Sequence, residues 1–260
     1  MPFWVALRET LKTLNVVNKK LNLYIFIILF CGLIPTFLNS QSVSQNSPDV
    51  KAIKIANDVI YAMGGIESFN EIQYIGWTFF DVRKLIWDKK NDLVRIDYIK
   101  KQLTIITSLH SEETKLYMNG IEINHPDSLS KYSIKGKKIW ANDSYWLIMP
   151  FKLLDDGVNL KYVQDSMFNN ANATILEMTF ENVGFTPENK YWIYVDLNTN
   201  LVTQWSFFDK YSDTQAEFSN TWGDYKLYGN ILISGDRGVE GKLDDIQVWD
   251  ELQEDVFEKL

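Results

Sequence analysis

The residues of this chain that could take part in catalysis or hold a metal are few and scattered. Histidine occurs only at His110, beside a turn, and at His125, before a proline, and nothing in the sequence brings either to a serine and an aspartate as a hydrolytic triad requires. Asp155-Asp156 and Asp244-Asp245 offer oxygen ligands, but neither pair has the alternating spacing of a calcium loop. We therefore expect no catalytic residue, no metal site, no cofactor and no enzymatic activity.

A turn rich in glycine, Gly235-Asp236-Arg237-Gly238, has a composition that could cradle an anion through backbone N–H groups, assisted by the arginine. The alternative is an ordinary turn after a strand. Arginine is scarce, and the net charge of the chain is -8. Because phosphate binding draws on clustered lysine and arginine, we expect no binding to nucleic acid.

The most informative feature for function is the excess of aromatic side chains, which make up 14% of the chain. Eight of the nine tryptophans lie beyond residue 40. Trp, Tyr and Met side chains together can line an apolar cavity suited to a lipid or another hydrophobic molecule. The alternative is a packed core of sheet and helix, which is the commoner place for any single aromatic residue. The residues that we expect to bind such a ligand are Trp77, Trp140, Tyr145, Trp146, Met149, Phe151, Trp192 and Trp205.

The element expected to position many of these side chains is the apolar segment 138–157 in the middle of the chain. The spacing within this segment would place four residues on one face of a helix: Trp140, Ser144, Leu147 and Phe151. The three residues 142–144 are each able to cap a helix start, and the polar residues 127–138 are expected only to lead into the helix. Pro150 should end or kink it, because proline lacks an N–H and its ring opposes the preceding turn.

Antiparallel strands are predicted on both sides of this central helix. Near the start, apolar residues recur at helical spacing from Val50 to Met63, and Gly64-Gly65 should end that helix. From Ile72 onward, short runs of β-branched and aromatic residues alternate with polar turns, which is typical of antiparallel strands. Asn119-Gly120 is the clearest hairpin turn. The segment 190–197 has large residues on both alternating sides, which predicts a strand covered on both faces.

Residues 1–40 have the pattern of a secretory signal peptide. A basic pair, Lys19-Lys20, precedes an apolar run of about a dozen residues, followed by a proline and small polar residues. A bilayer span needs roughly 20 apolar residues, so a cleaved signal is favoured, and the alternative is an uncleaved anchor that contacts the membrane. We expect 41–47 to be a linker and 48–260 a single domain. The only cysteine, Cys31, lies in the leader, so the domain would contain no disulfide.

The charge of the predicted domain is more acidic than that of the whole chain. Residues 1–40 carry four basic side chains and one acidic one, so the total of -8 leaves -11 for residues 41–260. Together with the leader, this composition predicts an acidic periplasmic or secreted protein, or one anchored to a membrane by an uncleaved leader.

The order of elements resembles exported bacterial proteins of the lipoprotein-carrier type, with the LolA/LolB-like fold. More narrowly, the chain is similar to uncharacterised exported proteins of Bacteroidetes-type bacteria. The resemblance covers residues 48–250, and its motifs are less specific than a catalytic fingerprint. It rests on Ala62-Met63-Gly64-Gly65, Trp77, Trp87-Asp88, Trp146, Pro150-Phe151, Tyr194-Val195-Asp196 and Leu201-Val202.

This resemblance implies an α+β fold with a strongly curved antiparallel sheet, an incomplete barrel of about eleven strands, whose concave face is plugged by helices. Members whose role is known hold acyl chains without covalent chemistry. By analogy of fold, the chain would bind or carry a lipid-like or other hydrophobic small molecule, with an envelope protein as a second partner. The main alternative is a structural or protein-interaction module of the cell envelope without a ligand, and an enzyme comes third.

Overall fold

The computed structural model describes residues 49–168, 171–252 and 255–259, all of which belong to one unit, 46–260. The predicted signal segment with Cys31 and the linker 41–47 lie outside the described residues, so export, cleavage and anchoring stay predictions. The helices are α2 (Val50–Ala62), α3 (Ile66–Glu71) and α4 (Pro126–Ile148), with short 3-10 helices η1 (Met149–Lys152) and η2 (Gly238–Glu240). None of the helices in the described part of the chain is long and apolar enough to cross a membrane.

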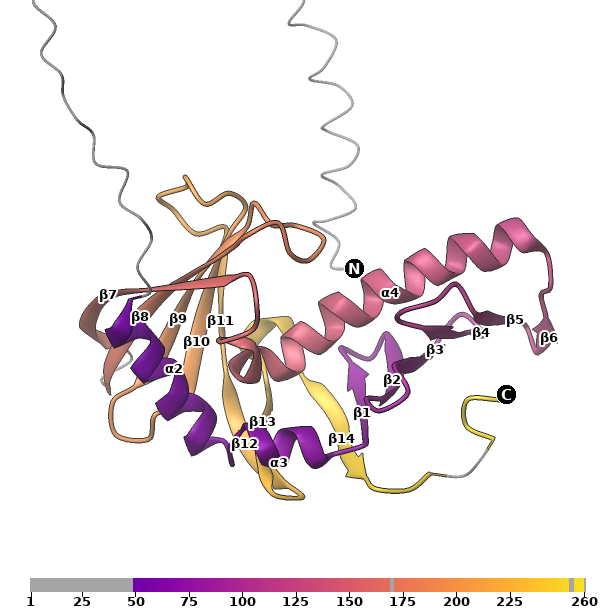
Figure 1. Ribbon diagram of the computed structural model, residues 1–260, viewed down its shortest axis with the longest axis horizontal. Coiled ribbons are helices and arrows are strands. Elements are labelled where there is room, and N and C mark those ends of the chain that lie inside the picture. Colours follow the sequence, from indigo (N-terminus) through magenta and orange to yellow (C-terminus); the bar gives the residue numbers. More distant parts are fainter. Residues whose placement is uncertain (1–48, 169–170, 253–254, 260) are drawn as a thin grey trace, which may run out of the picture. The chain divides into compact units, whose positions relative to one another are not determined.

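Strands dominate the rest of the described chain and pair only in antiparallel fashion (Figure 1). The seven-stranded sheet has the order β14 (Leu243–Trp249), β1 (Tyr74–Phe79), β2 (Arg83–Asp88), β3 (Leu93–Tyr98), β4 (Leu103–Ser108), β5 (Thr114–Met118) and β6 (Ile121–Glu122). The five-stranded sheet has the order β11 (Phe218–Thr221), β10 (Val202–Phe208), β9 (Lys190–Asp196), β8 (Ala171–Phe180) and β7 (Val158–Phe168). A third sheet pairs β12 (Gly223–Tyr228) with β13 (Ile231–Asp236).

The predicted fold class is confirmed at the level of an α+β protein with open antiparallel sheets, but the strand count is not. The described residues contain fourteen strands in three sheets rather than about eleven in one. One reason lies at Trp222, because the alternating run 218–226, which we expect from the sequence to be one strand, divides there into β11 and β12. The Trp222 side chain is almost fully buried, and the chain leaves one sheet for another at this residue.

Helix α4 begins much earlier than the apolar pattern predicts. It starts at Pro126, after His125 at the N-cap, so the polar stretch 127–138 is helical rather than a lead-in segment. Its buried side there consists of small residues, Ser133 and Gly136. A Cβ atom at Gly136 would lie 2.7 Å from Cγ2 of Thr107, so the helix approaches β4 closely. The predicted end of the helix before Pro150 is confirmed.

Helix α2 ends where it is predicted to end, and Asp49 is its N-cap. The Asp49 carboxylate accepts hydrogen bonds from the backbone N–H of Ala52 (3.0 Å) and of Tyr162 in β7 (2.8 Å), which ties the helix start to the five-stranded sheet. Gly64 has φ +108°, and a Cβ atom there would clash with the carbonyl oxygen of Asn230. Val50, expected on the core face, is instead 80% exposed.

The outward face of the seven-stranded sheet is partly covered by residues 255–259. Nη1 of Arg95 donates to the carbonyl oxygens of Val256 (2.9 Å) and Lys259 (2.8 Å). The ring of Phe257 stacks on Tyr74 with 6.4 Å between centroids. Residues 255–259, the tail, are therefore attached to the sheet through their carbonyl oxygens and through the ring of Phe257.

Candidate functional site

Aromatic side chains gather where the last turn of α4 meets the five-stranded sheet. We call this set the aromatic cluster, and it consists of Tyr145, Trp146, Phe180, Tyr191, Trp205, Phe207 and Phe218. Each ring lies beside another: the centroids of Trp146 and Trp205 are 4.7 Å apart, and those of Tyr191 and Trp205 are 5.1 Å apart. The two rings from α4, Tyr145 and Trp146, are neighbours in sequence. The rings from the sheet share one face, because successive side chains of a strand point to alternate faces.

The register of the five-stranded sheet explains how rings that are distant in sequence become neighbours. Tyr191 lies opposite Phe207, which itself lies opposite Phe218. Cross-strand pairs of this kind bring side chains on the same face into contact, and the Phe207 and Phe218 centroids are 5.0 Å apart. The cluster therefore extends across β9, β10 and β11 as a continuous surface of rings.

The exposed fraction of the rings increases along the cluster from Trp205, which we call its floor, to Phe218, which we call its edge. Trp205 is 1% exposed, Trp146 and Tyr191 are half-buried, and Phe218 is 38% exposed. Burial raises the pKa of Tyr145 well above its usual value and also raises the pKa of Tyr191. Both phenols are therefore neutral at physiological pH, and the cluster is an uncharged surface.

Three of the eight predicted ligand residues belong to the aromatic cluster, namely Tyr145, Trp146 and Trp205. Two others pack elsewhere along α4 and η1: Trp140 contacts Trp87 of β2 with 5.2 Å between centroids, and Phe151 stacks on Phe69 at 4.6 Å. The side chains of Trp77 and Met149 are buried in the same hydrophobic core. Whether any of the eight contacts a ligand stays a prediction.

Trp192 lies on the opposite face of β9 from the cluster. Its ring contacts Phe208 at 5.3 Å, and its Nε1 donates to Oε2 of Glu177 at 3.3 Å. The sequence shows large side chains on both alternating sides of this strand, and the structure places Tyr191 rather than Trp192 toward α4. Four cluster members, Phe180, Tyr191, Phe207 and Phe218, were absent from the predicted set. Their alternation is visible in the sequence, but the face that meets α4 is not.

Two buried arginines hold the last turns of α4 in place. Arg83 of β2 forms a bidentate ion pair with Asp143, in which both N–O distances are 2.6 Å and the side chains are 7% and 0% exposed. Arg237, fully buried, donates through Nε to the carbonyl oxygen of Trp146 at 3.1 Å and through Nη1 to Oγ of Ser234 at 2.8 Å. Burial lowers the pKa of Arg237 to about 9, so it remains largely protonated at neutral pH.

The position of Arg237 also bears on the two alternatives for the glycine-bracketed turn. Its guanidinium points into the protein and donates to protein oxygens, including the carbonyl oxygens of Ser234 (3.0 Å) and Asp236 (2.7 Å). These contacts favour a structural turn over an exposed anion cradle.

One histidine and one member of each acidic pair have polar or charged partners of their own. His110 has a side chain that is 80% exposed, with Nε2 2.7 Å from Oδ2 of Asp92. Asp155 pairs with Lys152, and Asp245 accepts from Oγ1 of Thr78 at 2.9 Å. Across the described ranges, no group of three or more His, Cys, Asp or Glu residues is placed to hold a metal ion.

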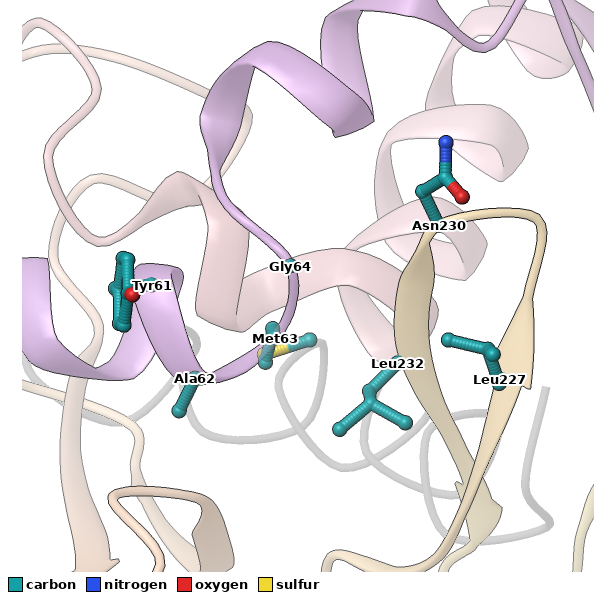
Figure 2. A pocket seen from close by; sticks show the side chains of 7 residues that line it. All are labelled: Tyr61, Ala62, Met63, Gly64, Leu227, Asn230 and Leu232. Carbon is teal, nitrogen blue, oxygen red and sulfur yellow. The ribbon is translucent and has the colours of Figure 1, made fainter.

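Two shallow, open hollows on the described residues lie at the surface, and neither is lined by the aromatic cluster. Figure 2 shows the first, between the end of α2 and the β12–β13 hairpin. Its lining residues are Tyr61, Ala62, Met63, Gly64, Leu227, Asn230 and Leu232. The second lies in the loop 212–217. Neither hollow includes a member of the cluster or any of the eight predicted ligand residues.

The fold and the cluster define an α+β protein with open antiparallel sheets and an aromatic surface under a long helix. No protein-family model matches the sequence, and no curated protein matches it. The chain is similar in fold to a candidate outer membrane lipoprotein-sorting protein domain from Vibrio parahaemolyticus, with 13% identity, a TM-score of 0.41, and coverage of 80% of this chain and 96% of that one.

Two further solved structures are similar at the same level. A LolA superfamily protein from Nitrosomonas europaea has 11% identity and a TM-score of 0.41, covering 80% of this chain and 97% of that one. A DUF1329 family protein from Desulfovibrio piger has 11% identity and a TM-score of 0.44, covering 82% and 98%. One of these belongs to the class that the sequence resembles. With TM-scores below 0.5, none of them assigns a ligand to this chain.

Proposed function

We propose that this protein reversibly binds an apolar, lipid-like molecule at the aromatic cluster, without covalent chemistry. The observation that supports the proposal is the continuous series of rings that begins at buried Trp205 and ends at Phe218, which is 38% exposed. A hydrophobic ligand entering at Phe218 would bury each methylene against rings, at about 0.8 kcal/mol per methylene. Exposed and buried rings in one series give such a ligand both an entrance and a place to lie.

The entrance would open through side chains at the sheet edge rather than through release of α4. Breaking the buried Arg83–Asp143 pair costs about 3–5 kcal/mol, and Arg237 holds the same part of the helix. Rotation of the half-exposed Phe207 and Phe218 rings breaks no hydrogen bond, because these side chains contain only carbon and hydrogen. We therefore propose that α4 closes one side of the binding site and stays in place while the rings move.

The proposed setting is the periplasm or the exterior of the cell, with an envelope protein as donor or acceptor of the ligand. This setting follows from the predicted signal peptide. In that role the protein would exchange its ligand with a partner rather than transform it.

Lipid that co-purifies with the full chain tests the proposal directly. Native mass spectrometry of the purified protein should show a bound lipid, and Trp146→Ala should reduce the bound fraction about tenfold because it removes a ring in contact with Trp205. Trp192→Ala is the matched control, since it removes the same type of side chain from the opposite face of the sheet. Equal losses in both variants would contradict the proposed site.

A second candidate is a structural or protein-interaction module of the envelope with a permanently closed core. It is favoured by the near-complete burial of Trp205 and by the absence of any cluster residue from the two hollows described above. Under this alternative the purified chain carries no lipid, and added fatty acids leave its tryptophan fluorescence unchanged. The same two measurements therefore separate the two candidates.

A further inference from the structure

The floor of the aromatic cluster presents hydrogen-bond donors that have no acceptor among the described residues. These donors are Nε1 of Trp205, Nδ2 of Asn220 and Nε1 of Trp222. Their side chains are 1%, 3% and 1% exposed. Buried polar groups in native proteins are nearly always paired, so three unpaired donors in one place call for a chemical explanation.

The three donors belong to one face of the five-stranded sheet and its continuation. Asn220 of β11 lies directly opposite Trp205 of β10, and the next residue on the same side along the chain is Trp222. The rings of Trp205 and Trp222 are in contact, with 5.2 Å between centroids. The cluster member Phe218 lies on this same face, two residues before Asn220. The donors and the ring surface are therefore parts of a single site.

The buried guanidinium of Arg237 places a positive charge next to Trp222, one of these three donors. The guanidinium of Arg237 lies over the Trp222 ring at 3.6 Å, and within the described residues it donates hydrogen bonds to carbonyl and hydroxyl oxygens, not to a carboxylate. Arg237 forms no ion pair within the described residues that would neutralise it. A buried positive charge favours a partner with negative charge or strong acceptor oxygens.

We propose that the ligand is an acyl compound whose carboxyl group, free or esterified, lies at Trp205, Asn220 and Trp222, while its chain runs outward along the rings toward Phe218. Carboxyl oxygens accept hydrogen bonds from the three donors and, when the group is ionised or esterified, bring no donor of their own. A quaternary ammonium group offers no acceptor and is repelled by Arg237. This assignment rests on the proposed function, because it names the polar end of the same ligand.

Three probes of equal chain length test the assignment on the full chain: dodecanoate and dodecyltrimethylammonium, each below its micellar concentration, and methyl dodecanoate below its solubility limit. Quenching of tryptophan fluorescence gives their dissociation constants. Dodecanoate or its methyl ester should bind at least tenfold more tightly than the ammonium compound. The overall charge of -8 would favour the cation non-specifically, so this preference runs against the bulk electrostatics. Preference for the acid indicates a free carboxylate, and equal binding of acid and ester indicates an acylated molecule.

Substitutions at two adjacent residues test whether the preference for dodecanoate over the ammonium compound arises at Asn220. Asn220→Leu removes the Nδ2 donor at similar volume and should weaken dodecanoate binding about tenfold, with no change for the ammonium compound. Thr221→Val is the matched control. It removes a hydroxyl that is also buried and unpaired, but that belongs to the alternate face and lies near Gly238. It should leave both dissociation constants unchanged.

The outcomes separate this assignment from the proposed function. Tight binding of all three probes, or preference for the cation, would overturn the carboxyl assignment while leaving hydrophobic binding at the cluster intact. Binding of none of the probes would reject the proposed function and the assignment with it. If Asn220→Leu unfolds, Trp222→Phe removes a second donor while keeping an aromatic ring, and an unchanged preference for dodecanoate in that variant would overturn the assignment.

Discussion

Replacing Asp143 by alanine removes one partner of the buried ion pair that joins α4 to β2, and we expect a large loss of stability. Arg83 and Asp143 have side chains that are 7% and 0% exposed and share two N–O contacts of 2.6 Å. In Asp143→Ala, the guanidinium stays buried without its counter-charge, at a cost of about 3–5 kcal/mol. For a folded unit of this size, about 4 kcal/mol corresponds to a melting temperature lower by about 8–16 °C.

The cost of leaving one charge buried without its partner differs from the net contribution of the ion pair to stability. Because desolvation offsets most of the attraction between two buried charges, Arg83→Met combined with Asp143→Leu should recover most of the lost stability. Urea unfolding followed by tryptophan fluorescence gives the free energy of unfolding for the single and double variants. A loss below about 1 kcal/mol in Asp143→Ala, or a double variant as unstable as the single one, would refute the account of α4 as held by this pair.

Three further predictions concern other contacts. Gly136→Ala should lower the free energy of unfolding by about 1–2 kcal/mol although alanine is the better helix former, because its Cβ would lie 2.7 Å from Cγ2 of Thr107; an increase in the urea midpoint would contradict the close approach of α4 to β4. Burial lowers the pKa of Lys89 to about 8 from 10.5, with the charge of Lys152 adding to the shift. Between these values the unfolded chain binds more protons than the folded one, so stability should rise with pH across this window. Lys89→Met should lose that rise, as measured by melting temperature from pH 7 to 10, and a parallel profile would exclude Lys89 as its source. Arg95→Gln should increase amide hydrogen exchange within residues 255–259 about tenfold while changing the melting temperature by less than about 3 °C, because it releases contacts local to the tail; unchanged exchange would show that the tail is held by other contacts.

Local patterns in the sequence were sufficient to predict the fold class and several boundaries. Alternation of β-branched and aromatic residues predicts antiparallel strands, and Asn119-Gly120 does form the β5–β6 turn, with φ +52° and +79°. Gly64 ends α2, and Pro150 follows the end of α4. These features depend on residues within a few positions of each other, and the sequence therefore contains the whole signal.

The first half of α4 was missed because its buried side is small rather than apolar. Ser133 and Gly136 give no hydrophobic periodicity, yet they let the helix approach β4 closely. The division at Trp222 was missed for a related reason, since a strand that changes sheets keeps the same alternation of residues. In both places the deciding quantity is the distance to a partner far away in the sequence.

The sequence by itself determined that this chain is rich in aromatic residues, poor in histidine and cysteine, and built mainly from antiparallel strands with a helix in the middle of the chain. The tertiary structure decided which rings meet: Tyr191 faces α4 while Trp192 faces the other way, and Phe218 joins Trp146 across 72 positions of sequence. It also decided that Trp205, Asn220 and Trp222 lie together on one face as buried donors without acceptors among the described residues. Alternation along a strand gives two equivalent faces, and only the packing of α4 on one of them makes that face a candidate site.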